Sequence, residues 1–130
     1  MPNSSAKKKI LVVEDEAEYR TLLREVLGKA GYAVFDASTG EAGLSLYREQ
    51  GPDLLLLDVM LPDMTGFDFC TKVRAGKVRP NTPILFCTVR SAVSQLAKGI
   101  KAWGTDYVLK PFDPENLLER VSVALRTGLA

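Results

Sequence analysis

The chain has 130 residues, of which 46% are hydrophobic and 25% charged, enough for a single domain that folds without a disulfide or a structural metal. Basic and acidic residues nearly cancel to a net charge of +1, so the charge balance suggests neither a nucleic acid nor an anionic membrane as partner. The chain has no histidine, which excludes histidine-based acid–base catalysis and a phosphohistidine carrier.

Apolar runs bounded by acids, glycine or proline predict strands, and apolar residues three to four positions apart predict helices. The expected elements, in chain order, are a strand at 10–13, a helix at 17–30, a strand at 32–35, a helix at 38–49, a strand at 53–58, a helix at 67–75, a strand at 84–88, a helix at 91–103, a strand at 106–109 and a helix from 114 to about 125. Strands that alternate with helices in this way predict an α/β fold with a parallel sheet covered on both faces.

Local signals mark several helix ends. Gly31 suits the end of the first helix, and the spacing of Ser38 and Glu41 matches a capping box at the start of the second. Asp113 is expected to cap the last helix, with Pro114 at its first position.

The sequence predicts one domain with short segments at both ends. We expect a flexible tail at 1–8, the domain at 9–127, and a terminal stretch or linker start at 128–130. No apolar run approaches the roughly 20 residues that span a bilayer. Cys70 and Cys87 lie far apart in apolar surroundings, which predicts reduced core residues of a cytoplasmic protein.

Four of the predicted strands end in residues that carry chemistry. The strand ends are Glu14-Asp15, Asp58, Thr88 and Lys110. Ligands of open parallel sheets bind at the carboxyl ends of the strands, so we expect these side chains to meet at one edge. Glu16 is interpreted as the acidic start of the first helix.

This set of residues suits phosphoryl transfer. Each close pair of carboxylates repels by about 4 kcal/mol at an effective dielectric near 20, so the cluster needs a cation. Oxygen ligands without cysteine or histidine favour Mg²⁺ over zinc. A cation, a lysine and a hydroxyl together can neutralise a transferring phosphoryl group, with Asp58 as the nucleophile that forms an acyl phosphate.

The same residues also resemble a known family. In this order along the chain, Glu14-Asp15, Asp58 with the segment 59–66 behind it, Thr88, Tyr107 and Lys110-Pro111-Phe112 look like the receiver domain of two-component response regulators. The resemblance runs from Lys9 to Leu125. It implies a flavodoxin-like, CheY-like doubly wound fold with five parallel strands in the order 2-1-3-4-5 and five helices.

The resemblance also implies a metal site. Mg²⁺ would be bound directly by Asp15, Asp58 and the backbone carbonyl of Met60, and through water by Glu14. Asp58 would be the residue that is phosphorylated.

Roles for the other strand ends come from the same resemblance. Lys110 would pair with the phosphoryl group or, before phosphorylation, with Asp58, and Thr88 would hydrogen-bond a phosphoryl oxygen. Tyr107 would change between exposed and buried rotamers. The Lys110–Pro111 peptide bond is expected to be cis.

The partners implied are a histidine kinase or histidine phosphotransfer protein as donor, and an output protein or a missing output domain. The output surface would be formed by the helix at 91–103, the strand at 106–109 and the last helix. A phosphorylation-dependent homodimer is a further option, and no direct contact with nucleic acid or membrane is expected. The domain would catalyse its own phosphorylation and dephosphorylation without being a metabolic enzyme.

One residue departs from the family pattern. Val89 follows the switch hydroxyl, where the family usually has alanine or glycine. We expect Val89 to narrow access to Asp58 and to slow small phosphodonors, attacking water or both. Arg90, the next residue, is also expected to influence hydrolysis of the phosphorylated aspartate, in a direction that the sequence does not indicate.

Three alternative functions fit these residues less well. A pseudo-receiver that only binds partners is disfavoured by the full acidic set with Thr88 and Lys110. An aspartate-nucleophile phosphatase of the haloacid-dehalogenase type normally has a second acid two residues after the nucleophile, and here that position is Met60. A flavin-binding module lacks the phosphate loop expected after the first strand.

Overall fold

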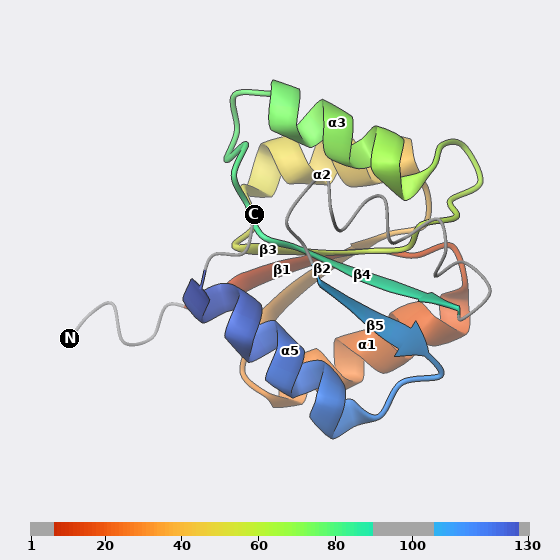
Figure 1. Ribbon diagram of the computed structural model, residues 1–130, viewed down its shortest axis with the longest axis vertical. Helices are drawn as coiled ribbons and strands as arrows, with labels where there is room; N and C mark the ends of the chain where they lie inside the picture. Colours follow the sequence, from red (N-terminus) through yellow and green to blue (C-terminus); the bar gives the residue numbers. More distant parts are fainter. Residues whose placement is uncertain (1–6, 90–105, 128–130) are drawn as a thin grey trace.

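A computed structural model describes residues 7–89 and 106–127 (Figure 1). The elements in these residues are β1 (Lys9–Val13), α1 (Ala17–Lys29), β2 (Ala33–Ala37), α2 (Gly40–Gln50), β3 (Leu54–Leu57), α3 (Gly66–Ala75), β4 (Ile84–Val89), β5 (Asp106–Lys110) and α5 (Pro114–Thr127). The helix expected at 91–103 lies outside the described residues. All strand pairs are parallel, and the sheet order β2-β1-β3-β4-β5 confirms the expected doubly wound fold.

The sheet is the middle layer of three. Helices α2 and α3 lie on one face, and α1 and α5 lie on the other (Figure 1). Strand β3 is buried along its whole length, as its unbroken leucine run predicts. Because successive side chains of a strand point to opposite faces, Leu55 and Leu57 pack under α2 and α3, whereas Leu54 and Leu56 pack under α1 and α5.

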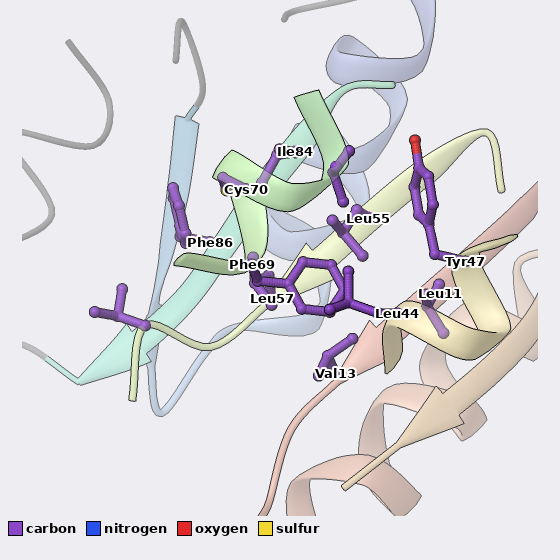
Figure 2. Packing of buried hydrophobic residues seen from close by; sticks show 12 residues of the cluster. Leu11, Val13, Leu44, Tyr47, Leu55, Leu57, Phe69, Cys70, Ile84 and Phe86 are labelled. Carbon is purple, nitrogen blue, oxygen red and sulfur yellow. The ribbon is translucent and has the colours of Figure 1, made fainter. Parts of the chain in front are cut away.

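The α2/α3 side of the core is built around large rings. Figure 2 shows the rings of Phe69 of α3 and Tyr47 of α2 in one cluster with Leu55 and Leu57 of β3. Both rings are almost completely buried. Fully burying side chains of this size contributes about 1.5–3 kcal/mol each, so this cluster fixes how α2 and α3 lie on the sheet.

The end of α1 confirms the role expected for Gly31. Ala30 is the C-cap residue, and Gly31 follows with a φ of 99°. The Gly31 N–H donates to the carbonyl of Gly28 (3.0 Å), and the Tyr32 N–H donates to that of Leu27 (3.2 Å). This pair of bonds is a Schellman motif, which glycine favours because it has no Cβ to clash.

The start of α2 corrects the sequence prediction by one residue. The N-cap is Thr39, not Ser38, and its hydroxyl accepts an N–H group of the first turn at 3.1 Å. The expected capping box between Ser38 and Glu41 is therefore wrong. A distant carboxylate replaces it, because Asp63 accepts the N–H groups of Gly40 (2.7 Å) and Glu41 (2.9 Å).

Helix α5 follows its sequence signals. Asp113 accepts an N–H group of the first turn at 3.3 Å, as expected of a capping residue. Leu117 and Val121 are fully buried against the sheet, and Leu118 and Leu125 are partly buried beside them. Among the described residues, no helix has the length and apolar character needed to cross a membrane.

Candidate functional site

The carboxyl edge of the sheet brings the predicted strand ends together. The Asp58 N–H donates to the carbonyl of Val13 (3.1 Å), which sets the acids after β1 and β3 side by side. On the other side of β3, Thr88 is the last residue but one of β4, and Lys110 is the last residue of β5. Glu14, Asp58, Thr88 and Lys110 are all buried, so the polar groups of this edge lie within the protein rather than in water.

Both oxygens of the Asp58 carboxylate accept hydrogen bonds. The ammonium of Lys110 donates to Oδ2 at 2.9 Å. The Thr88 hydroxyl (3.3 Å) and the Met60 backbone N–H (3.2 Å) donate to Oδ1. The carboxylate is thus held in one orientation at the end of β3.

Lys110 is the centre of the cluster. Its ammonium forms ion pairs with Glu14 and Asp58, lies 3.4 Å from an oxygen of Glu16, and lies 4.6 Å from the centroid of the Tyr19 ring. Burial alone lowers the pKa of Lys110, but the bonds to Glu14 and Asp58 outweigh burial and raise that pKa above its ordinary value. Lys110 therefore remains charged at neutral pH.

Glu16 and Tyr19 are the contacts that sequence reasoning missed. Glu16 is the N-cap residue of α1, but its side chain makes no capping hydrogen bond and instead lies beside Lys110. Tyr19 places its ring under the same ammonium, a cation–π arrangement, and its other neighbour is the Phe112 ring with centroids 6.1 Å apart. The chain separates Glu16 from Lys110 by 94 positions, so no local pattern could have paired them.

Glu14 is the most perturbed acid of the site. Its side chain is 1% exposed, and one oxygen accepts the Glu16 N–H at 3.0 Å. Burial raises the pKa of Glu14 to about 7; Lys110 opposes this and the charge of Asp58 adds to it. A carboxyl group with this pKa is a good partner for a cation that displaces its proton.

The acids after β1 form a group of hard oxygen donors. Carboxylate oxygens of Glu14, Asp15 and Glu16 lie within 4.8 Å of one another, and the Asp15 side chain is exposed at the rim. Oxygen donors of this kind fit Mg²⁺, which accepts a few protein oxygens and keeps several waters. Met60, whose carbonyl was expected to bind the ion, is 56% exposed in the loop directly after β3.

Gly66 shapes the loop that carries Asp58. Its N–H donates to the carbonyl of Val59 at 2.7 Å, and a Cβ at this position would lie 2.7 Å from the Asp58 carbonyl oxygen and 3.0 Å from the Val59 Cα. The first turn of α3 thus packs directly on the backbone of the loop. Only glycine fits there without displacing it.

The other residues predicted from the sequence lie on β4, on β5 or directly after β5. Tyr107 of β5 is half-buried and packs against the core on the α2/α3 side. Val89, the last residue of β4, is 43% exposed at the carboxyl edge, and Arg90 lies outside the described residues. The Lys110–Pro111 bond is cis, as expected.

Both cysteines are core residues, as predicted. Cys70 and Cys87 are buried free thiols on opposite sides of the sheet. Burial raises the pKa of each thiol to about 12, so neither is a reactive thiolate at neutral pH.

Comparisons with known proteins place the chain in a family. The family model of the response regulator receiver domain matches residues 10–122. The transcriptional regulatory protein ResD of Bacillus subtilis is 38% identical over 118 residues, covering 91% of this chain and 48% of that protein. The transcriptional regulatory protein AfsQ1 of Streptomyces coelicolor is 39% identical over 119 residues, covering 92% of this chain and 52% of that protein. The chain spans about half the length of these curated relatives.

Solved structures share the fold. The chemotaxis response regulator CheY4 of Vibrio cholerae has a TM-score of 0.83 and 34% identity, and the match covers 91% of this chain and 98% of that one. A CheY-like response regulator receiver domain protein of Methanospirillum hungatei has a TM-score of 0.84 and 28% identity, covering 95% and 97%. With this fold and this family match, the chain belongs to the response regulator receiver domains of two-component systems.

Proposed function

We propose that the domain is a phosphoacceptor switch in which Asp58 receives a phosphoryl group. The observation that carries the proposal is the Asp58 carboxylate, held at the end of β3 with Lys110 on one oxygen and Thr88 on the other. These are the two donors that a phosphoryl group on Asp58 needs for its own oxygens.

The reaction follows from this arrangement. An Asp58 oxygen attacks phosphorus, a new P–O bond forms, and the bond to the donor breaks. The donor group leaves with the electron pair, and a leaving imidazole then takes a proton from water. Lys110 and Thr88, which here donate to Asp58, would then donate to the equatorial oxygens over which the charge of the phosphoryl group in transfer is spread.

Mg²⁺ would be held at the acidic end of this site. The proposed ligands are Asp15, Asp58 and the Met60 carbonyl, with Glu14 acting through water; of these, Glu14 and Asp15 belong to the group of close carboxylate oxygens after β1. When bound, the ion would neutralise phosphoryl oxygens that the lysine alone cannot. Asp58 pairs with Lys110 through Oδ2 and accepts hydrogen bonds from Thr88 and the Met60 N–H through Oδ1, so an ion bound here would share this carboxylate with those donors.

Phosphorylation would then be read at β5 and α5. The phosphoryl group adds about −1.5 to −2 charges, for which Lys110 and Thr88 must rearrange. A shift from 1:99 to 99:1 between two states requires about 5.5 kcal/mol, which a few charge-assisted hydrogen bonds can supply. Tyr107 lies on β5 beside Phe86 of β4 and is proposed to change rotamer with the shift.

The proposed partners are a histidine kinase or a phosphotransfer protein as donor, and an output protein or output domain. The surface proposed for output is the region 91–103 together with β5 and α5, and phosphorylation-dependent dimers would use the same surface. Because the named relatives are transcriptional regulators of about twice this length, control of an output domain is one form of this proposal. We place the domain in the cytoplasm.

The test is intact mass after incubation with Mg²⁺ and a small acyl-phosphate donor. We expect the wild type to gain one phosphoryl group and the Asp58→Asn variant to gain none. A chelator should prevent the gain. A gain in the variant would show that another residue accepts the group and would overturn the assignment.

Val89 decides how a negative result is explained. If the wild type gains nothing, the Val89→Ala variant is treated in the same way, because Val89 lies exposed beside the site. Phosphorylation of Val89→Ala alone would identify an obstructed site. No phosphorylation of either protein, also with a kinase donor, would favour a pseudo-receiver that only binds partners.

A further inference from the structure

A concave surface lies at the end of the sheet opposite the acidic cluster. The groove lies between the last turns of α2 and α3 and the loop after α3, with a volume of about 230 Å³. Its apolar lining is formed by Leu44, Tyr47, Val73 and Val78. We name it the α2–α3 groove. Because helices in this fold run back from the carboxyl edge, the groove lies at the far end of the sheet from Asp58.

Hydrogen bonds hold the loop beside the groove in place. Arg74 donates to the carbonyl oxygens of Pro80 and Thr82, both at 2.8 Å. The Tyr47 hydroxyl donates to the carbonyl of Arg79, and the Thr82 hydroxyl donates to that of Pro52 at 2.9 Å. The groove is therefore preformed, as binding pockets usually are.

The rim of the groove is entirely basic. Arg48, Lys72 and Lys77 line it together with the apolar residues, and no acidic side chain among the described residues lines it. Within the part of the chain that the structure describes, none of these three cations takes part in an ion pair, whereas Arg79 nearby is paired with Asp53 at 3.1 Å. Because the net charge of the whole chain is only +1, the three rim cations are a local excess of positive charge.

We propose that the α2–α3 groove is a docking site for an acidic segment of a partner protein. The segment would insert one or two large apolar side chains into the groove and place carboxylates against the three rim cations. Charge complementarity selects the acidic partner, and the apolar lining selects a protein segment. Nucleic acid fits less well, because Tyr47 is only 3% exposed and offers no ring for a base to stack on.

This site is separate from the phosphoacceptor chemistry. The groove shares no residue with the cluster around Asp58 and Lys110 and lies at the other edge of the sheet. Binding there should therefore be the same for the phosphorylated and unphosphorylated protein. Such a site would bind a partner in both phosphorylation states, whereas the carboxyl edge would change with phosphorylation.

The probe is a short synthetic helical peptide with leucines at i and i+4 and glutamates around them. Titrated into the ¹⁵N-labelled domain, it should shift amide signals of α2, α3 and the loop after α3, and leave those of α1 and α5 unchanged. Affinity should fall with added salt. The double variant Lys72→Glu/Lys77→Glu should bind about tenfold more weakly or worse, since two attractive contacts become repulsive.

The matched control is Lys29→Glu/Arg126→Glu. It reverses two exposed cations at the ends of α1 and α5, on the other face of the sheet, and should bind as the wild type does. A second peptide carries lysines in place of the glutamates and should not bind.

Four results would overturn the proposal: equal binding of the lysine peptide, equal loss in both double variants, shifts away from the groove, or no binding by the wild type. A single-stranded oligonucleotide that displaces the peptide and shifts the same amides with higher affinity would also overturn it in favour of nucleic acid. Mass-spectrometric phosphorylation of Asp58 is unaffected by any of these results, so the two proposals fail independently.

Discussion

The two edges of the sheet bury polar groups in opposite ways. At the carboxyl edge, the buried groups are charged side chains that bond to one another, with Lys110 held between Glu14 and Asp58. At the amino edge, the end of the sheet where the strands begin and the α2–α3 groove lies, Arg74 and Thr82 instead donate to backbone carbonyls, and one further Arg74 nitrogen is buried without a partner among the described residues.

The difference shows what each edge does for the protein. Burying a cluster of charges costs desolvation free energy, which here raises the pKa of Glu14. Pairing a side chain with a backbone carbonyl satisfies a group that would otherwise be buried without a partner, so it stabilises the fold. The carboxyl edge is therefore suited to chemistry at some expense of stability, and the amino edge to holding the structure.

The largest expected effect is the pH dependence caused by Glu14. Its pKa in the folded domain is about 7, against an ordinary value of 4.5, so the folded state binds this proton more tightly than the unfolded state. The corresponding stability is fully present below pH 4.5 and is lost as pH rises through 7. At 1.36 kcal/mol per pH unit, the loss is at most about 3 kcal/mol.

Urea unfolding of the wild type and of Glu14→Gln, both with a chelator present, measures this effect. The variant carries no titrating group at this position, so its advantage over the wild type should grow from pH 4.5 to pH 7. An energy difference that stays constant over this range would contradict the raised pKa.

The second prediction concerns the backbone contact at Gly66. Gly66→Ala places a Cβ within 2.7 Å of the Asp58 carbonyl oxygen, so we expect a loss of about 1–3 kcal/mol in the free energy of unfolding. Slower phosphorylation of Asp58 should accompany it, because the loop must move. The control is Gly28→Ala, where a Cβ has no neighbour within 4 Å and should be neutral or stabilising by up to about 1 kcal/mol.

Two buried threonines allow a direct comparison of the edges: Thr82 lies just before β4, at the amino edge, and Thr88 lies near the end of β4, at the carboxyl edge. Thr82→Val removes a hydroxyl that donates to the Pro52 carbonyl, and should lower the free energy of unfolding by about 1 kcal/mol without changing phosphorylation. Thr88→Val removes a hydroxyl that donates to Asp58, and should slow phosphorylation with a smaller loss of stability. Urea unfolding and the phosphorylation rate are measured for both variants. If the two variants lost the same free energy of unfolding and the same phosphorylation rate, the two edges would not differ in role.

The smallest effect is expected at Asp63, which joins the exposed loop after β3 to α2. Its bonds to the Gly40 and Glu41 N–H groups lower its pKa, so its stabilising contribution is present at neutral pH and is lost as pH falls through the lowered pKa. Asp63→Asn should have a slightly lower melting temperature than the wild type at pH 7 and the same one at low pH. The control is Glu49→Gln, which removes a charge on α2 itself and should have the melting temperature of the wild type at pH 7.

Much of the fold could be predicted because its signals are local. The leucine run of β3, the helical spacing in α1 and the caps at Gly31 and Asp113 each depend on a few neighbouring residues, and the structure confirms them. The start of α2 could not be predicted in this way. Its N–H groups bond to Asp63, which is more than 20 positions away, and that contact displaces the local capping box.

The site, like the fold, has features that the sequence predicts and features that depend on packing. The sequence alone indicated Glu14, Asp58, Thr88 and Lys110, because parallel strands bring their carboxyl ends to one edge and these residues end four strands. That rule predicts which residues meet, but not how their side chains turn. Which oxygen of Asp58 faces Lys110, and the burial that raises the pKa of Glu14, depend on packing around the edge.

Only the tertiary structure decided three further features: Glu16 and Tyr19 contact Lys110, α3 packs on the loop at Gly66, and the basic rim surrounds an apolar groove between α2 and α3. Each depends on surfaces of separate elements that meet only when the sheet is complete. A sequence pattern reports the period and the ends of one element, whereas a contact between elements depends on the twist of the sheet and on the volume of every side chain between them.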